Sequence, residues 1–345
     1  MWIRVKALIY MVQDTVMLWH GGFSVMPDTG ISKGEVEYYR TLLDTCISNI
    51  QRKIVGKTRE LQIILATLFS QGHVLLEGVP GTAKTLMAKA LAATLGLEFK
   101  RIQATPDLLP SDVIGVNIYD PRTGSFVFRK GPVFTNILLF DEVNRAPPKT
   151  QSALLEAMQE RQVTVEGETY KLPEPFLVIA TMNPVETEGT FPLPEAQVDR
   201  FLARVMIGYP SIDETIEVLK RFDEIAVLED LKPVLDRDTV LRLMALSKRI
   251  YVDENIMRYI ATIVEATRRH PMVKLGASPR GAIALLLLSR SLALIQGRSY
   301  VIPDDVKQVA YAALSHRLIL RSEARLSRLT PESIIDDILE KVEPP

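Results

Sequence analysis

The chain has 345 residues, of which 47% are hydrophobic and 24% are charged, and its formal net charge at pH 7 is −1. This composition is typical of a folded globular protein, and the length favours two domains rather than one. The near-zero net charge provides no general attraction to nucleic acid or to an anionic membrane. The single cysteine, Cys46, excludes an internal disulfide and a cysteine metal cluster, which fits a reducing compartment.

The N-terminal segment is predicted to carry no targeting signal. An apolar stretch at residues 7–12 follows two basic residues, but Gln13 and Asp14 interrupt it and leave too short an apolar core for a signal peptide. The most apolar stretch of the chain, residues 282–288, is far shorter than the roughly 20 residues that a transmembrane helix needs. We therefore expect a cytoplasmic protein without membrane insertion, in which residues 1–31 are an extension outside the fold.

A phosphate-binding loop is predicted near residue 80. Two amphipathic helices, at residues 32–49 and 57–69, precede a short apolar strand at residues 73–77. The strand is followed by a helix that ends before Gly96, and the eight residues between them are Gly78, Val79, Pro80, Gly81, Thr82, Ala83, Lys84 and Thr85. A strand, a glycine turn and a helix in this order direct backbone N–H groups toward an anion.

Two side chains of this loop are expected to contact the ligand directly. Lys84 would reach the β- and γ-phosphates of a nucleotide, and Thr85 would place a hydroxyl on Mg²⁺. Ala83 departs from the standard pattern, which has glycine immediately before the lysine. On these eight residues alone, a glycine-rich turn that caps a core helix remains the alternative.

A pair of acidic residues follows the next buried strand. Residues 97–103 form a second strand, which predicts a βαβ unit in a parallel sheet, and residues 118–128 form an added hairpin with a five-residue loop. The apolar strand at residues 137–140 ends at Asp141 and Glu142, on the sheet edge where ligands bind. We interpret Asp141 as the carboxylate that orders the Mg²⁺ shell and Glu142 as the group that polarises a water. The alternative is a solvated acidic strand end.

Further polar residues follow the later strands. The predicted elements are a helix from Pro147, a hairpin at residues 163–172, a strand at 176–181, a short helix at 194–202 and a strand at 204–209. Asn183 follows the strand at residues 176–181, where its amide could orient a water without adding charge, although an Asn-Pro pair is usually only a turn. The short helix contains Arg200.

The last third of the chain is predicted to be helical. Pro210 marks a domain boundary, which divides the chain into an α/β domain at residues 32–209 and a helical domain at residues 210–345. A capping box formed by Ser211 and Glu214 begins the second domain, and further helices are predicted at residues 238–250, 254–269, 279–296, 304–317 and 332–342. Arg280 lies at a helix N-terminus, where a cation is unfavourable. An anionic ligand would offset that cost, and a solvated surface arginine is the alternative.

Together these segments resemble the MoxR-type AAA+ ATPases over about residues 32–320. The resemblance rests on the loop at residues 78–85, on the uninterrupted block at 138–160, and on Ala-Thr-Met-Asn-Pro (180–184), Leu-Pro-Glu-Ala-Gln-Val-Asp-Arg-Phe (193–201) and Ser-Pro-Arg (278–280). It implies an α/β fold, with an αβα sandwich around a five-stranded parallel sheet and a C-terminal all-helical lid domain. The two hairpins mark the helix-2-insert clade, which also contains magnesium chelatase motor subunits and minichromosome-maintenance helicases.

The resemblance also implies ATP and Mg²⁺ as cofactors and hydrolysis of ATP to ADP and phosphate. Glu142 looks like the catalytic base, Asn183 like sensor 1, and Arg280 like sensor 2. Arg200 looks like an arginine finger that acts on the neighbouring subunit's ATP. The metal would be held by Thr85 and Asp141, and the nucleotide would be bound by Val55, Gly56, Gly78, Val79, Pro80, Gly81, Thr82, Ala83, Lys84, Thr85, Leu86, Asp141 and Arg280.

By the same resemblance, the protein would form a ring, most simply a hexamer, and would remodel or mature a client enzyme complex with a von Willebrand A-domain protein as partner. The alternatives are a magnesium-chelatase-like motor, a nucleic-acid translocase, and a nucleotide-bound scaffold that switches without turnover. The scattered basic residues and the net charge argue against stable nucleic-acid binding. The sequence leaves open whether Arg280 acts on its own subunit's nucleotide or on a neighbour's.

Overall fold

The computed structural model describes residues 31–345, except residue 80, residues 184–188 and residues 227–229. The predicted N-terminal extension therefore lies outside the described residues except for Ile31, and so do Pro80 of the loop and Pro184 after Asn183. In the part of the chain that is described, no helix is both long enough and apolar enough to cross a membrane.

A parallel sheet of five strands lies at the centre of the described residues, in the order β2–β5–β8–β1–β9. Its strands are β1 (Val74–Glu77), β2 (Phe99–Gln103), β5 (Ile137–Asp141), β8 (Leu177–Met182) and β9 (Ala203–Met206). Every residue of β1 and β5 is buried, which explains why these strands are continuous apolar runs in the sequence. The predicted five-stranded parallel sheet is confirmed.

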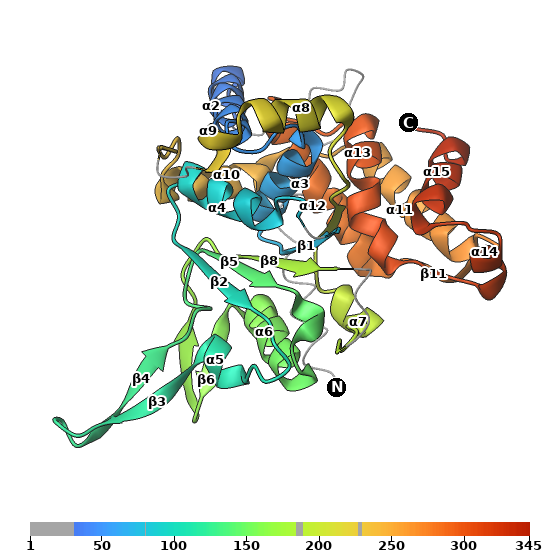
Figure 1. Ribbon diagram of the computed structural model, residues 1–345. Coiled ribbons are helices and arrows are strands. Elements are labelled where there is room, and N and C mark those ends of the chain that lie inside the picture. The colour runs from blue at the N-terminus through green and yellow to red at the C-terminus, as the bar shows by residue number, and fades with distance from the viewer. Residues whose placement is uncertain (1–30, 80, 184–188, 227–229) are drawn as a thin grey trace, which may run out of the picture.

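Helices cover both faces of this sheet (Figure 1). One side carries α2 (Lys33–Gln51), α3 (Thr58–Phe69) and α4 (Lys84–Thr94), and the other carries α5 (Pro110–Ile114) and α6 (Pro148–Glu160). Alternate residues of β5 face the two sides, since Ile137 and Leu139 join the core that contains α3, whereas Leu138 and Phe140 join the core that contains α6. The αβα sandwich is as predicted, with two further short elements, η1 (Val143–Arg145) and α7 (Glu195–Val198).

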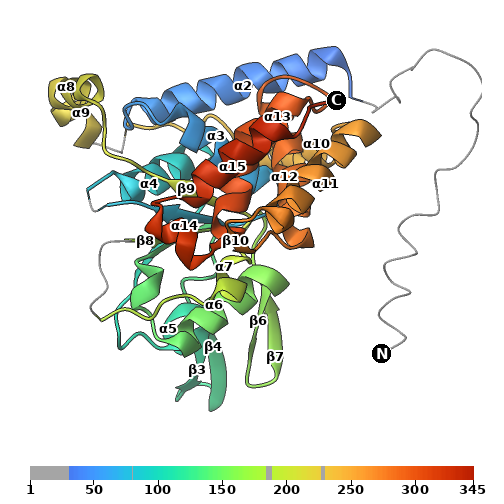
Figure 2. The ribbon, with the colours of Figure 1, turned by 90° about the vertical axis from the view of Figure 1, so that its right-hand side faces the viewer.

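Both predicted hairpins are present, and they project from the same end of the molecule (Figures 1 and 2). The first is β3 (Gly115–Asp120) with β4 (Ser125–Lys130), and the second is β6 (Gln162–Val165) with β7 (Glu168–Lys171). The first hairpin has a four-residue loop rather than the predicted five, because Asp120 pairs with Ser125. The aromatic rings of Phe128 and Tyr170 stack with their centroids 4.1 Å apart, so the two hairpins support each other.

The C-terminal part is helical, as predicted. It contains α8 (Ile212–Lys220), α9 (Phe222–Ala226), α10 (Arg237–Arg249), α11 (Glu254–Arg269), α12 (Pro279–Ile295), α13 (Pro303–Leu314), η2 (Ser315–Arg317), α14 (Ser322–Leu326) and α15 (Pro331–Lys341). The capping box at the start of α8 is confirmed, since the backbone N–H of Glu214 donates to Ser211 Oγ at 3.1 Å and the backbone N–H of Ser211 donates to the Glu214 carboxylate at 2.8 Å.

A small antiparallel ladder lies among these helices and was not predicted. It pairs β10 (Val273–Leu275) with β11 (Ile319–Leu320). Strands of three and two residues are too short to produce a recognisable alternation in the sequence. The ladder brings the residues that lead into α12 next to the residues that follow η2.

One hydrophobic core joins the helical part to the sandwich. Helix α12 packs against α3 as well as against α10, α11 and α13. Leu285 and Leu288 of α12 belong to the same buried cluster as Leu61 and Leu65 of α3. The boundary at Pro210 remains a prediction, because the core is continuous across it.

A buried histidine connects the sheet to α6. His73 Nδ1 accepts a hydrogen bond from the backbone N–H of Val178 at 2.9 Å, and its Nε2 donates to the carbonyl oxygen of Met158 at 3.0 Å. This pairing requires the neutral ring with its proton on Nε2. Burial lowers the pKa of His73 to about 4 from an ordinary value of 6.5.

The first prediction concerns the pH dependence of stability. Between these two pKa values the unfolded chain binds a proton at residue 73 and the folded chain does not, so acid favours unfolding. At pH 7.5, His73→Gln should lower the free energy of unfolding relative to the parent. We expect this difference between parent and variant to be smaller by about 2 kcal/mol at pH 5, because acid destabilises only the parent through residue 73. Urea unfolding of both proteins at the two pH values tests this, and a pH-independent difference would contradict it.

Candidate active site

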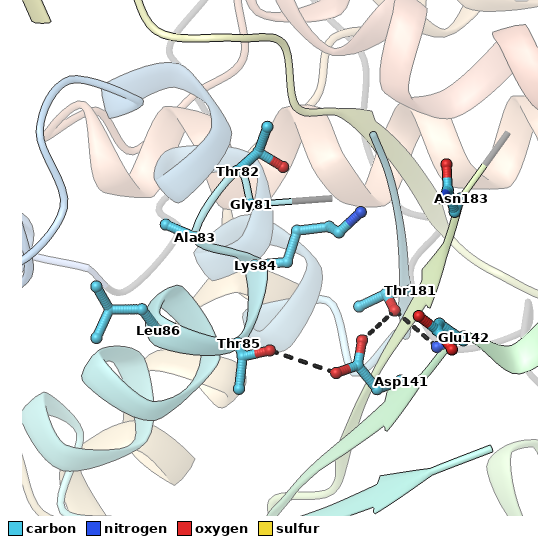
Figure 3. Close-up of a pocket in the computed structure, with 10 residues that line it drawn as sticks. All are labelled: Gly81, Thr82, Ala83, Lys84, Thr85, Leu86, Asp141, Glu142, Thr181 and Asn183. Atoms are coloured by element: carbon cyan, nitrogen blue, oxygen red, sulfur yellow. Dashed lines mark hydrogen bonds between the residues drawn. The ribbon is translucent and has the colours of Figure 1, made fainter. Parts of the chain in front are cut away.

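A cavity of about 410 Å³ opens at the carboxyl edge of the sheet, between the start of α4 and the ends of β5 and β8 (Figure 3). Open parallel sheets bind ligands at this edge. The cavity is lined by Gly81, Thr82, Ala83, Lys84, Thr85, Leu86, Asp141, Glu142, Thr181 and Asn183. Nine of these ten residues were singled out from the sequence, and Thr181 was not.

The loop before α4 adopts a backbone that favours glycine at two positions. Gly81 has φ +80°, and Ala83 has φ +60°, which is the left-handed region. An L side chain in that region costs roughly 1–2 kcal/mol relative to the right-handed one, which explains why the standard motif has glycine where this chain has Ala83. At Gly78, a Cβ atom would lie 2.4 Å from the carbonyl oxygen of Ile207, so the close packing of the loop against the segment after β9 excludes a side chain.

The ammonium group of Lys84 points into the cavity (Figure 3). It donates to the carbonyl oxygens of Gly78 and Val79, the latter at 3.4 Å, and Thr82 Oγ1 also donates to Val79 at 2.9 Å. A cation held at the entrance of a helix, beside the backbone N–H groups of the helix's first turn, is the arrangement that binds phosphate groups.

Asp141 is buried at the end of β5 and accepts hydrogen bonds from three sides. Thr181 Oγ1 donates to its Oδ1 at 2.5 Å, and Thr85 Oγ1 donates to its Oδ2 at 3.3 Å. Arg101 of β2 donates to the same Oδ2 from Nη2 at 2.7 Å and from Nε at 3.2 Å. These contacts engage both oxygens of the carboxylate, and they aim Oδ2 at the hydroxyl of Thr85.

Glu142 follows in a left-handed conformation, with φ +57°. Its backbone N–H donates to Thr181 Oγ1 at 2.8 Å, and its Oε2 accepts from Gln103 Nε2 at 2.9 Å and from Arg145 Nη1 at 3.1 Å. The Thr181 hydroxyl therefore accepts from Glu142 and donates to Asp141. The Thr181 side chain thus links the Asp141 carboxylate to the backbone of Glu142 (Figure 3).

Arg101, Gln103 and Thr181 escaped the sequence analysis. Arg101 and Gln103 carried a weak signal, because they are polar residues in a strand of the sheet. Thr181 lies within the Ala-Thr-Met-Asn segment, from which only Asn183 was predicted as a site residue. Both side chains are buried and line the same cavity.

The two predicted arginines lie elsewhere. Arg200 and Arg280 line a second cavity of about 260 Å³, together with Arg161 and Arg317. Arg280 Nη1 lies 3.6 Å from Asp199 Oδ2, and Ser278 Oγ accepts the backbone N–H of Arg280 as the N-cap of α12. Among the residues described as lining the two cavities, none is shared. The structure therefore places the arginines in a different cavity from the one that the phosphate-binding loop lines.

Val55 and Gly56 form the turn between α2 and α3, and the described lining of the first cavity does not include them. Gly56 has φ +68°, and a Cβ atom there would lie 1.9 Å from Glu214 Oε1 of α8. The turn is thus held closely between the start of α3 and the start of α8.

The donor atoms in the first cavity fit Mg²⁺. A hydroxyl and a carboxylate, from Thr85 and Asp141, lie 3.3 Å apart and present the hard oxygen ligands that this ion prefers. Within the described residues there is no cluster of three or more acidic, histidine or cysteine side chains that could hold a metal alone. Mg²⁺ usually binds in this way, with one or two protein groups and the remaining ligands from water and substrate phosphates.

Comparison with family models assigns the class of protein. The model of the ATPase family associated with various cellular activities (AAA) matches residues 73–203, and the AAA lid domain model matches residues 265–338. The first match covers four of the five strands of the sheet, up to the start of β9, and the first cavity, and the second covers α12 to α14 and most of α15. The fold and the site together define an AAA+ ATPase.

Similar proteins narrow the assignment. The chain is 50% identical over 305 residues to YeaC, an uncharacterised protein of Bacillus subtilis (strain 168), covering 88% of this chain and 95% of that protein. It is 43% identical over 334 residues to the chaperone MoxR1 of Mycobacterium tuberculosis, covering 93% of this chain and 88% of that protein. A solved structure from Cytophaga hutchinsonii, provisionally described as an ATPase, has a TM-score of 0.84 at 42% identity and covers 91% of this chain and 98% of its own.

The chain belongs to the MoxR family of AAA+ ATPases, and it hydrolyses ATP.

The second prediction tests the part played by Thr181. Thr181→Val keeps the shape of the side chain but removes the hydroxyl that links Asp141 to Glu142. Because a hydrogen bond to a charged group contributes about 1.5–3 kcal/mol, we expect kcat for ATP hydrolysis to fall on the order of 10- to 100-fold. Thr181→Ser retains the hydroxyl and should stay within a few-fold of the parent. Steady-state ATPase assays at saturating ATP measure both, and a Val variant with the parent's kcat would refute the assignment.

Proposed function

We propose that this protein is a chaperone-like MoxR ATPase that works as a ring, most simply a hexamer, and remodels client protein complexes. The observation that carries the proposal is the division of the site between two cavities. The phosphate-binding loop and the acids line one cavity, whereas Arg200 and Arg280 line the other. A chaperone activity is supported by the similarity to MoxR1.

In this proposal the first cavity binds the triphosphate of ATP. The backbone N–H groups from Gly81 to Leu86 and the ammonium of Lys84 hold the phosphates, in place of the loop carbonyls that Lys84 contacts now. The turn at Val55 and Gly56 contacts the adenine. Thr85 and Asp141 hold Mg²⁺, which neutralises charge on the β- and γ-phosphates.

Two side chains at the strand ends act on the attacking water. Glu142 polarises it as the base, and Asn183 orients it with an amide that adds no charge. Gln103 of β2 and Arg145 of η1 hold the Glu142 carboxylate at 2.9 and 3.1 Å, so the base is already oriented by its neighbours. The amide of Gln103 is neutral, whereas Arg145 forms an ion pair with the same carboxylate.

The further positive charge that stabilises the transferred phosphoryl group would come from a neighbouring subunit. Arg200 and Arg280 lie together on a different surface from the loop, so a subunit that packs this surface against its neighbour's first cavity would complete that site. Such a heterologous contact closes into a ring when its rotation permits. An arginine supplied across subunits contributes on the order of 10³-fold or more to phosphoryl transfer. We therefore propose that Arg280, like Arg200, acts on the neighbour's nucleotide.

The third prediction tests this division by mixing inactive subunits. Arg200→Ala should lose on the order of 10³-fold in kcat while still binding ATP, and Glu142→Gln should bind ATP without turnover. An equimolar mixture of the two variants should regain activity. About one interface in four then joins the intact site of an Arg200→Ala subunit to the intact arginine of a Glu142→Gln subunit. Arg280→Ala should behave like Arg200→Ala in the same mixture. Mixtures that stay as inactive as their components would show that the arginines act within their own subunit.

A protein-binding surface is available on the first hairpin. Its exposed apolar side chains are Val116, Ile118, Tyr119, Phe126 and Val127. Clustered exposed apolar side chains mark protein contacts more often than scattered ones do. We assign this hairpin to contact with the client complex or with a von Willebrand A-domain partner.

The fourth prediction concerns these partners. The Glu142→Gln ring held in ATP should recover a von Willebrand A-domain protein with an attached enzyme from native lysate. Adding Tyr119→Ser and Phe126→Ser should abolish that recovery without affecting ATP binding. Leu326→Ser, at an apolar residue of α14 that is even more exposed, is the control and should recover the partners normally. Recovery of tetrapyrrole-pathway proteins or of nucleic acid instead would favour a chelatase-type motor or a translocase.

A further inference from the structure

Arg317 makes an unusually complete set of contacts for a residue outside the first cavity. It is the last residue of η2, and its side chain is only 3% exposed. Its Nε donates to Asp199 Oδ1 at 2.8 Å, and its Nη2 donates to the carbonyl oxygens of Asp199 at 3.2 Å and Phe201 at 2.8 Å. Its Nη1 donates to the carbonyl oxygen of Leu202 at 3.3 Å and to that of Ala313.

Most of these contacts go to one short turn, Asp199–Leu202, which contains Arg200. The Arg317 guanidinium bonds to Asp199, Phe201 and Leu202, which surround Arg200 in the sequence. The neighbouring His316 adds a contact, since its Nε2 lies 3.2 Å from the carbonyl oxygen of Phe201. A planar guanidinium with donors in a fixed fork holds several acceptors in one geometry, which a lysine cannot do.

The same turn is connected to Arg280. Asp199 Oδ1 accepts from Arg317, while Asp199 Oδ2 lies 3.6 Å from Arg280 Nη1 and 3.4 Å from Ser278 Oγ. One carboxylate therefore joins the turn that bears Arg200 to the start of the helix that bears Arg280. The β10–β11 ladder pairs the chain segment before Ser278 with the segment after Arg317.

We propose that Arg317 is a positioning residue, which fixes the Asp199–Leu202 turn to the helical part so that Arg200 and Arg280 are presented to the neighbouring subunit as one rigid unit. This inference rests on the proposed function of the two arginines. Its consequence is that a displacement of the helical part in one subunit moves both arginines together and alters hydrolysis in the next. The hydrogen bonds of Arg317 described above all go to protein groups of its own chain, so in this proposal it acts through Arg200.

The fifth prediction follows from this placement. A displacement of about 1 Å can reduce the rate on the order of 10²-fold, so Arg317→Met should lower kcat by about that factor while leaving the affinity of its own site for ATP unchanged. Arg317→Lys keeps the charge but loses the fork, and it should fold and show a smaller loss of the same kind. Asp199→Asn, which removes the charge that Arg317 and Arg280 share, should also lower kcat without weakening ATP binding.

Subunit mixing separates a positioning role from a structural one. Arg317→Met or Arg317→Lys mixed with Glu142→Gln should regain activity, because the variant's own site is intact and the Glu142→Gln subunit supplies a correctly held arginine. Arg298→Met is the matched control, since Arg298 is also a largely buried arginine of the helical part but pairs with Asp305. It should lower the melting temperature without a comparable loss of kcat.

The possible outcomes are distinct. If Arg317→Lys hydrolyses ATP like the parent, the inference about Arg317 is wrong. It is also wrong if Arg317→Lys is impaired and mixing it with Glu142→Gln restores no activity, while the mixture of Arg200→Ala with Glu142→Gln is restored. If the Arg200→Ala mixture also fails, the proposed function of the arginines is wrong and the inference falls with it. Recovery in both mixtures, with unchanged ATP affinity in the Arg317 variants, supports the inference.

Discussion

The register between β5 and β8 sets the position of each acid in the site. Phe140 pairs with Ala180, so the next residues along the two strands, Asp141 and Thr181, meet at the sheet edge. The Thr181 hydroxyl then joins Asp141 to the backbone of Glu142. Because a slip of one residue would turn every side chain of a strand to the opposite face, the apolar packing that fixes the register also fixes the chemistry. The packing of the hydrophobic core thus also determines the positions of the site residues.

Core packing likewise determines where the arginines lie. Helix α12 is buried against α3 along one side, and at its N-terminus it presents Arg280 beside Asp199. The core that stabilises the helical part therefore also places a cation at a surface. The chain presents the phosphate-binding loop and the arginines in separate cavities. In the proposed ring, this separation is the physical reason why two subunits would be needed to complete one site.

Much of the fold could be predicted because its elements are long or strongly patterned. The buried strands are continuous apolar runs, and both hairpins have clear turn residues, so their pairing was confirmed with an error of one residue in the first loop. The short elements α5, α9, α14 and the β10–β11 ladder were missed, since two to five residues carry no measurable periodicity. In the site, the loop and the acids were recognisable as local motifs. Arg101 and Gln103 were not, because each contacts an acid that lies about forty residues away in the chain.

The sequence by itself determined the order of strands and helices, the phosphate-binding loop and the acids that follow β5, because each depends on residues adjacent in the chain. The class and family followed from the same motifs. Only the tertiary structure decided which distant side chains orient those acids, and that Arg200 and Arg280 share a cavity apart from Lys84. It also decided that Arg317 encloses the Arg200 turn. These facts depend on how α12, η2 and the sheet pack in space, and no local pattern in the chain records that packing.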